Sequence, residues 1–129
     1  MFVELKLLAA AVVLGLIHLG WAGAASTGQR GPAWNLGNRE NAPPLTGLAH
    51  RLDRAFANYR ESFPFFAALV IVAFLGGRAG GLATWGEWIW LGARIVYLPV
   101  YAAGIKGLRS AVWVVSLIGL LMILSALFA

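Results

Sequence analysis

The feature that most constrains this chain is a long uncharged run near its start. No residue between Lys6 and Arg30 carries a charge, and the stretch from Leu7 to Ala25 is almost wholly apolar. A helix needs about 20 apolar residues to cross the hydrocarbon core of a bilayer, so this run predicts a membrane-spanning helix. Hydrophobic residues make up 60% of the 129 residues and charged residues only 12%, which leaves more apolar surface than a small water-soluble domain can bury. The sequence therefore predicts an integral membrane protein.

Three further apolar runs follow the first one. We predict an all-α fold, a four-helix membrane bundle in one domain over residues 1–129, with spans at about residues 5–25, 54–77, 82–105 and 110–129. Residues 26–51 contain many Gly, Pro and Asn and are predicted to form a long loop without a helix of its own. A secretory signal cleaved near Ala22 is the alternative for the first run. The run is longer than a signal core, and a single basic residue precedes it, which favours a retained anchor.

The basic residues predict how the four spans are oriented. Six of them lie in the first and third loops or at the helix ends beside those loops: Arg30, Arg39, Arg51, Arg54, Lys106 and Arg109. On the opposite side lie Lys6 and Arg78. By the positive-inside rule, loops one and three face the cytoplasm and both termini face outward. Because the basic residues sit in short separate segments and form no continuous stripe, we expect no nucleic-acid partner.

Polar residues inside the second and third runs need an explanation, because a charge at the centre of a spanning helix costs about 2.5 to 3.5 kcal/mol. The polar residues of the second run share one helical face and are Arg51, Arg54, Asn58 and Glu61. Those of the third run also share one face and are Arg94, Tyr97 and Tyr101. The two faces can therefore lie against each other.

Two interpretations of these faces remain open. In the first, Glu61 and Arg94 form an ion pair that neutralises both charges, and Asn58 joins the helices by a hydrogen bond. In the second, the surplus of Arg and Tyr, with Arg109 added, forms a pocket for a small ligand that bears carboxylates. The chain has no cysteine, and neither His18 nor His50 has partners at metal-ligand spacing, so we predict no metal site.

The segment RAFANYRESFP at residues 54–64 has the form R-A-x-x-N-x-x-E-x-x-P. The segment ARIVYLPVY at residues 93–101 has the form A-R-x-x-Y-x-x-x-Y. Both patterns resemble those of the MAPEG family, the membrane-associated proteins in eicosanoid and glutathione metabolism. The resemblance runs from about Asn38 to the C-terminus and suggests a bacterial-type member, in a bacterial inner membrane.

The resemblance implies a homotrimer that binds glutathione as co-substrate between neighbouring subunits, near the cytoplasmic side. By the same resemblance, the residues that would bind glutathione are Arg51, Arg54, Asn58, Glu61, Arg94, Tyr97 and Tyr101. Arg109 would be the catalytic residue beside the sulfur, because a guanidinium close to a thiol favours the nucleophilic thiolate. The implied function is that of a glutathione transferase or peroxidase, in which the thiolate attacks a hydrophobic electrophile that enters from the membrane lipid.

The basic residues depart from the family pattern in two ways. Arg109 follows Tyr101 by one residue more than in the family, which on an unbroken helix turns its side chain by about 100°. No residue clearly replaces the basic residue that several members carry in the first helix, and Arg30 and Arg39 are the candidates. A function of a different class, a non-catalytic lipid-binding or scaffold trimer with structural ion pairs, stays open as the alternative.

Overall fold

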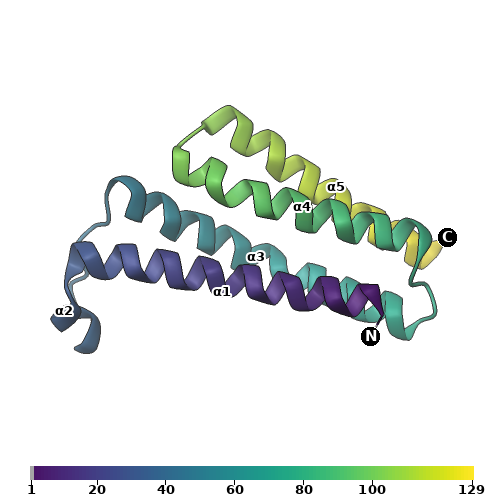
Figure 1. The fold of residues 1–129 in the computed structure, drawn as a ribbon, viewed down its shortest axis with the longest axis horizontal. Coiled ribbons are helices and arrows are strands. Elements are labelled where there is room, and N and C mark those ends of the chain that lie inside the picture. The colour runs from purple at the N-terminus through teal and green to yellow at the C-terminus, as the bar shows by residue number, and fades with distance from the viewer. Residues whose placement is uncertain (1) are drawn as a thin grey trace.

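The computed structural model describes residues 2–129, which form helices and no strand. The helices are α1 (Val3–Arg30), α2 (Pro32–Leu36), α3 (Gly47–Leu75), α4 (Gly81–Ala103) and α5 (Lys106–Phe128). Helix makes up 84% of the structure, so the predicted all-α class is confirmed. The four long helices run roughly parallel to one axis, and α2 is a short helix at one end (Figure 1).

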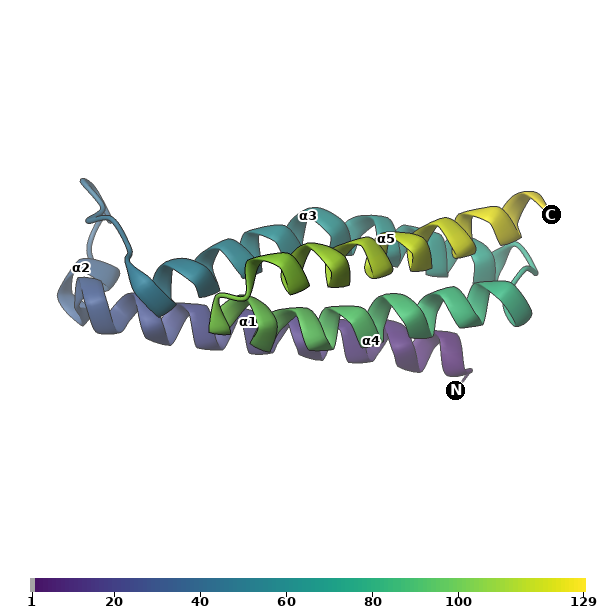
Figure 2. The ribbon, with the colours of Figure 1, turned by 90° about the horizontal axis from the view of Figure 1, so that it is seen from above.

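The long helices form two antiparallel pairs, α1 with α3 and α4 with α5 (Figures 1 and 2). Both termini and the α3–α4 turn lie at one end of the molecule, which we call the terminal end. The α4–α5 turn and α2 lie at the other, which we call the α2 end. The two pairs contact each other mainly through α3, which packs against both α4 and α5.

Glycines allow α4 and α5 to pack closely. A Cβ atom built on Gly86 would lie 2.6 Å from the carbonyl oxygen of Gly119, and one on Gly119 would lie 2.7 Å from the carbonyl oxygen of Gly86 and from the backbone nitrogen of Trp90. Small residues at a helix contact let two backbones approach, which is how helices associate where no hydrophobic effect drives them together.

Stacked aromatic side chains fill the space between the two helix pairs. Phe66 of α3 stacks on Trp90 of α4 with ring centroids 3.9 Å apart. Tyr59 contacts the same Trp90 and stacks on His18 of α1, with its hydroxyl donating a hydrogen bond to the carbonyl of Ala11. All five residues are at most 1% exposed. The aromatic core therefore fixes α3 between α1 and α4.

The predicted loop over residues 26–51 is wrong in part, because helices occupy both of its ends and α2 lies inside it. Gly31, with φ +92°, turns the chain out of α1, and Pro32 takes the first position of α2, where a missing N–H costs nothing. The amide of Gln29 donates to the carbonyl of Thr46, and the backbone N–H of Thr46 donates back to the Gln29 side-chain oxygen. These two bonds hold the end of α1 against the start of α3.

Three helices are long and apolar enough to span a membrane: α1, α3 and α5. Large apolar side chains cover their outer surfaces, with Leu16 60% exposed on α1, Ile71 44% exposed on α3 and Leu121 51% exposed on α5. Such surfaces are suited to lipid. The chain is a membrane protein. The third predicted span, now α4, is not among these three, and it carries Glu87 and Arg94, both fully buried.

Candidate functional site

A groove runs between α3 on one side and the α4–α5 pair on the other, and we call it the α3/α5 groove. It consists of three adjoining cavities that share Asn58, of about 450 Å³, 270 Å³ and 80 Å³. Asn58 lies in the middle of α3, so the groove has a polar part toward the α2 end and an apolar part toward the terminal end. Six of the eight predicted site residues line its cavities: Arg54, Asn58, Glu61, Tyr97, Tyr101 and Arg109.

The polar part holds the two tyrosines and Arg109. The rings of Tyr97 and Tyr101, one helical turn apart on α4, meet edge to face with centroids 5.5 Å apart. The guanidinium carbon of Arg109 lies 4.6 Å from the centre of the Tyr101 ring. Ser110 and Trp113 of α5 complete this cavity of about 450 Å³. A positive charge beside two phenol groups can receive an anion.

Arg109 reaches this cavity although its spacing from Tyr101 does not fit one continuous helix. Helix α4 ends at Ala103, the following Gly104 adopts the left-handed conformation with φ +78°, and α5 begins at Lys106. Tyr101 and Arg109 therefore lie on different helices. The rotation of about 100° per residue applies only within one helix, so it does not predict their relative orientation. The chain reversal places the Arg109 guanidinium over the Tyr101 ring, whereas an unbroken helix would turn it away.

Arg94 lies beneath the groove, and its side chain is 0% exposed. Its Nη1 donates a hydrogen bond of 2.8 Å to Oδ1 of Asn58, and its guanidinium carbon lies 4.2 Å from the Tyr97 ring centre and 5.4 Å from that of Tyr59. Its Nε and Nη2 have no hydrogen-bond acceptor among residues 2–129. The polar faces of α3 and α4 do meet, as predicted. The contact between them is the hydrogen bond of Arg94 with Asn58, not an ion pair with Glu61.

The predicted ion pair of Glu61 with Arg94 is therefore wrong for the single chain. Glu61 is exposed, on the opening of the groove, where it lines a cavity of about 80 Å³ with Arg54 and Tyr101. Arg54 is exposed as well. Because an amide and two aromatic rings already satisfy part of the Arg94 guanidinium, the helices pack without the carboxylate.

Arg51 lies outside the groove. Its Nε donates a hydrogen bond of 2.8 Å to the carbonyl of Ala102, in the last turn of α4. This carbonyl is among the last four of the helix, which have no partner within it. In the single chain Arg51 therefore ties the start of α3 to the end of α4.

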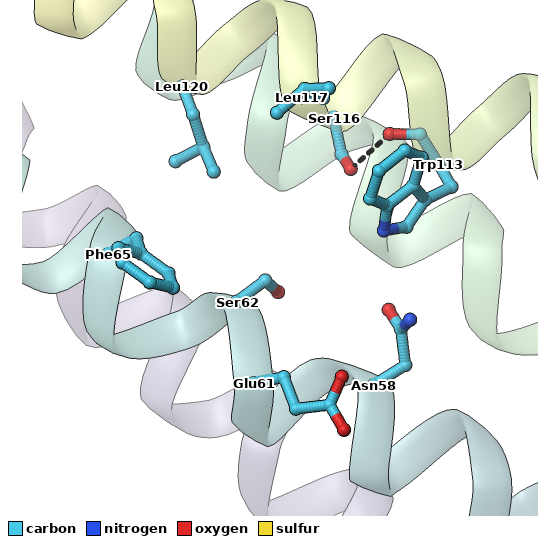
Figure 3. A pocket seen from close by; sticks show the side chains of 8 residues that line it. All are labelled: Asn58, Glu61, Ser62, Phe65, Trp113, Ser116, Leu117 and Leu120. Atoms are coloured by element: carbon cyan, nitrogen blue, oxygen red, sulfur yellow. Dashed lines mark hydrogen bonds between the residues drawn. The ribbon is translucent and has the colours of Figure 1, made fainter.

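The apolar part of the groove, shown in Figure 3, has a volume of about 270 Å³. Ser62 and Phe65 of α3 face the side chains of α5 across it. The α5 residues that line it are Trp113, Ser116, Leu117 and Leu120. This face of α5 is not among the predicted site residues beyond Arg109, although Arg109, Trp113, Ser116 and Leu120 recur at helical spacing.

A second cavity with basic walls lies on the other side of α3, between α1, α2 and α3, and we call it the basic cavity. It has a volume of about 330 Å³, and its charged lining residues are Arg30, Arg39, Asp53 and Arg60. The Arg30 guanidinium stacks on Trp34, and its Nε donates to the carbonyl of Pro43. Arg39 donates from its Nε to the carbonyl of Asn35. Arg30 and Arg39 thus line a cavity that lies on the other side of α3 from the α3/α5 groove.

Together these features define a class: an all-helical membrane protein with an arginine- and tyrosine-lined groove that adjoins an apolar one. Residues 5–129, nearly the whole chain, match the model of the MAPEG family. The chain belongs to the MAPEG family, as its two motifs predicted. Membership places it among membrane proteins of glutathione and eicosanoid metabolism. No individual curated protein gives a significant match.

Proposed function

We propose that this protein is a glutathione-dependent membrane enzyme that transfers the glutathione sulfur to hydrophobic electrophiles, or reduces hydrophobic peroxides. The observation that carries the proposal is the continuity of the α3/α5 groove. A cavity with Arg109 and two tyrosines adjoins an apolar cavity, and the two share Asn58 and Trp113. A charged peptide and a lipid-soluble substrate can meet at such a boundary.

In this proposal the chain's own residues divide the binding of glutathione between them. The guanidinium of Arg54 binds a carboxylate of the tripeptide, and the Glu61 carboxylate binds its ammonium group. Asn58, held by Arg94, offers its free amide N–H to a peptide carbonyl. Tyr97 and Tyr101 donate from their hydroxyls, and Arg51 holds the end of α4 in place.

The proposed chemistry is a nucleophilic attack by sulfur. Arg109 favours the thiolate, and the thiol proton leaves to water. In transfer, a bond forms between sulfur and the electrophilic carbon while the electron pair of the breaking bond leaves with the leaving group. In peroxide reduction, sulfur attacks one peroxide oxygen and becomes a sulfenic acid, while the O–O bond breaks and the other oxygen leaves as an alcohol after taking up a proton. A second glutathione thiol then displaces water from the sulfenic acid to form the disulfide.

A single copy of the chain leaves the groove open, with Arg54 and Glu61 exposed. We propose that a neighbouring copy in a homotrimer covers it. The basic cavity supports this assembly, because its cluster of arginines, with Arg30 and Arg39, is suited to contact the ligand of an adjacent subunit. We further propose four spans, α4 included, in a bacterial inner membrane, with the α2 end in the cytoplasm because six basic residues lie there against two at the terminal end.

The second candidate function is a non-catalytic lipid-binding or scaffold trimer. The apolar part of the groove favours it, since Phe65, Leu117 and Leu120 offer an acyl chain a surface without any chemistry. In that case the Arg94 and Asn58 contact serves only to join α3 to α4.

Calorimetric titration of glutathione into the protein in mild detergent tests the proposal. We expect binding with one site per subunit interface and a weaker response from Arg54→Gln, which keeps a polar side chain but loses the charge. The control is Arg78→Gln, because Arg78 is exposed in the α3–α4 turn at the other end of the molecule. If wild type releases no heat with glutathione, the scaffold function takes the place of the enzyme.

A further inference from the structure

A separate cavity of about 680 Å³ lies at the terminal end, between the first turn of α1 and the first turns of α4. Its lining includes Glu4 of α1 and Thr84, Trp85 and Trp88 of α4. It shares no residue with the α3/α5 groove or with the basic cavity. We call it the terminal cavity.

The wall of the terminal cavity contains a buried carboxylate. Glu4 is only 5% exposed, and its Oε1 accepts a hydrogen bond of 2.9 Å from the Thr84 hydroxyl. One neutral donor does not compensate for the removal of a carboxylate from water. An ionised Glu4 therefore attracts a cation into the cavity.

A second acidic side chain is buried nearby on α4. Glu87 lies on the same face of α4 as Thr84, one turn deeper, and is 0% exposed. Neither of its oxygens has a hydrogen-bond partner among residues 2–129. The Thr84 hydroxyl therefore donates to Glu4, and no donor among the described residues reaches Glu87.

The rest of the lining selects the kind of cation. Trp85 and Trp88 are 66% and 51% exposed at the rim, and the faces of tryptophan rings attract cations. Metal ions such as Ca²⁺ or Mg²⁺ require about six oxygen ligands, and residues 2–129 contain no group of three or more His, Cys, Asp or Glu that could hold one. A carboxylate beside aromatic rings instead suits an ammonium group that carries apolar substituents.

We propose that the terminal cavity binds the alkylammonium group of an amphiphile, with the cation against Glu4 and the rings of Trp85 and Trp88. Its apolar walls, open to the surroundings of the helices, take the chain attached to the nitrogen. The ammonium belongs either to the headgroup of a membrane lipid or to a free lipid-soluble amine. This site is independent of the proposed glutathione reaction, which lies at the other end.

The first experiment measures the charge selectivity of the site. Decyltrimethylammonium and decyl sulfate, each below its micelle concentration, are titrated by calorimetry into the full chain in a non-ionic detergent. We expect the cation to bind wild type at least tenfold more tightly than the anion. Glu4→Gln should weaken the cation at least tenfold. It still accepts the Thr84 hydrogen bond, so the helix contact remains.

The matched control is Glu40→Gln, which removes the same charge from an exposed residue at the α2 end. It should bind the cation as wild type does. Trp88→Leu, which leaves the Glu4 and Thr84 bond intact, should weaken the cation by about threefold or more. The proposal is overturned if Glu4→Gln binds the cation as tightly as Glu40→Gln, or if decyl sulfate binds wild type as well as the cation does.

The second experiment identifies the source of the ammonium. Wild type and Glu4→Gln are incubated with equal amounts of phosphatidylethanolamine and phosphatidylglycerol, and native mass spectrometry counts the lipids retained. Retention of phosphatidylethanolamine by wild type and its loss from Glu4→Gln would identify a lipid headgroup. Binding of decyltrimethylammonium without lipid retention would identify a free amine. Glutathione binding by Glu4→Gln should equal that of wild type, which separates this site from the α3/α5 groove.

Discussion

The two ends of the molecule bury opposite charges, and they do so in different ways. Toward the α2 end, Arg94 is fully buried, but Asn58 and two aromatic rings surround its guanidinium. At the terminal end, Glu87 is equally buried with no hydrogen-bond partner for either oxygen. One amide and two aromatic rings contact the Arg94 guanidinium, although its Nε and Nη2 lack acceptors, whereas no donor among residues 2–129 reaches the Glu87 carboxyl group.

The difference follows from the chemistry of the two groups. A guanidinium is planar, carries five donors and stacks on aromatic faces, so amide oxygens and tyrosine rings stabilise it inside a protein. A carboxylate only accepts hydrogen bonds, and the backbone N–H groups of a helix interior are already used within the helix. A buried Arg is therefore compatible with a purely structural role, whereas a buried Glu requires a donor or cation from elsewhere.

Removing Arg94 should have the largest effect. Arg94→Ala deletes the hydrogen bond to Asn58 and the contacts with two rings, so we expect it to lower stability by about 3 kcal/mol. Thermal melting in mild detergent measures the loss, with Arg78→Ala at an exposed position as the control. A melting temperature equal to that of wild type would mean that the contacts around Arg94 contribute nothing to the fold.

The next largest loss of stability should come from a change at the close contact between α4 and α5. Gly119→Ala places a methyl group 2.7 Å from the Gly86 carbonyl oxygen, and forcing the helices apart should cost about 2 kcal/mol in a melting experiment. Gly92→Ala is the control, because no heavy atom lies within 4 Å of its added Cβ. Equal melting of the two variants would show that the helices separate freely at this contact.

A smaller, functional effect is expected at Arg109. Arg109→Lys keeps the positive charge but replaces the planar group over Tyr101 with a flexible one. Conjugation of a model electrophile to glutathione should slow by about tenfold, equivalent to about 1.4 kcal/mol of transition-state stabilisation, while expression and melting stay unchanged. Arg78→Lys serves as the control. Equal rates in the two variants would restrict Arg109 to orienting α5.

The smallest effect should also have the opposite sign. Glu87→Gln removes the cost of burying or protonating a carboxylate that no donor satisfies, so we expect melting to rise by the equivalent of about 1 kcal/mol when no organic cation is present. Glu40→Gln, on the exposed loop, should leave melting unchanged. A fall in the melting temperature of Glu87→Gln would show that its carboxylate is as well accommodated as the Arg94 guanidinium, and the contrast between the two ends would disappear.

Several of these features could be predicted from the sequence. The apolar runs predicted the helical membrane class, and the spacing of polar residues predicted that Asn58 and Arg94 lie on facing surfaces of α3 and α4. The motifs of residues 54–64 and 93–101 predicted the family. These predictions succeeded because helical periodicity and hydropathy are local properties of the chain.

Other features could not be predicted in this way. The spacing of Glu61 and Arg94 is compatible with an ion pair, and only the packing of α3 against α4 shows that Asn58 takes that place. The terminal cavity joins Glu4 to Thr84, eighty residues apart in the chain, so no local pattern indicates it. In the sequence, Glu4 is only a single acidic residue two positions before Lys6, with no pattern around it that indicates a site.

The sequence by itself determined which stretches become helices and that they belong in a membrane, because helix formation and partition into lipid depend on residues close together in the chain. The tertiary structure decided which polar groups meet. The turn at Gly104 sets the direction of Arg109, and the packing of α1 against α4 brings Glu4 beside Thr84. Such contacts depend on how rigid helices pack across long separations in sequence, and hydropathy and periodicity carry no information about that packing.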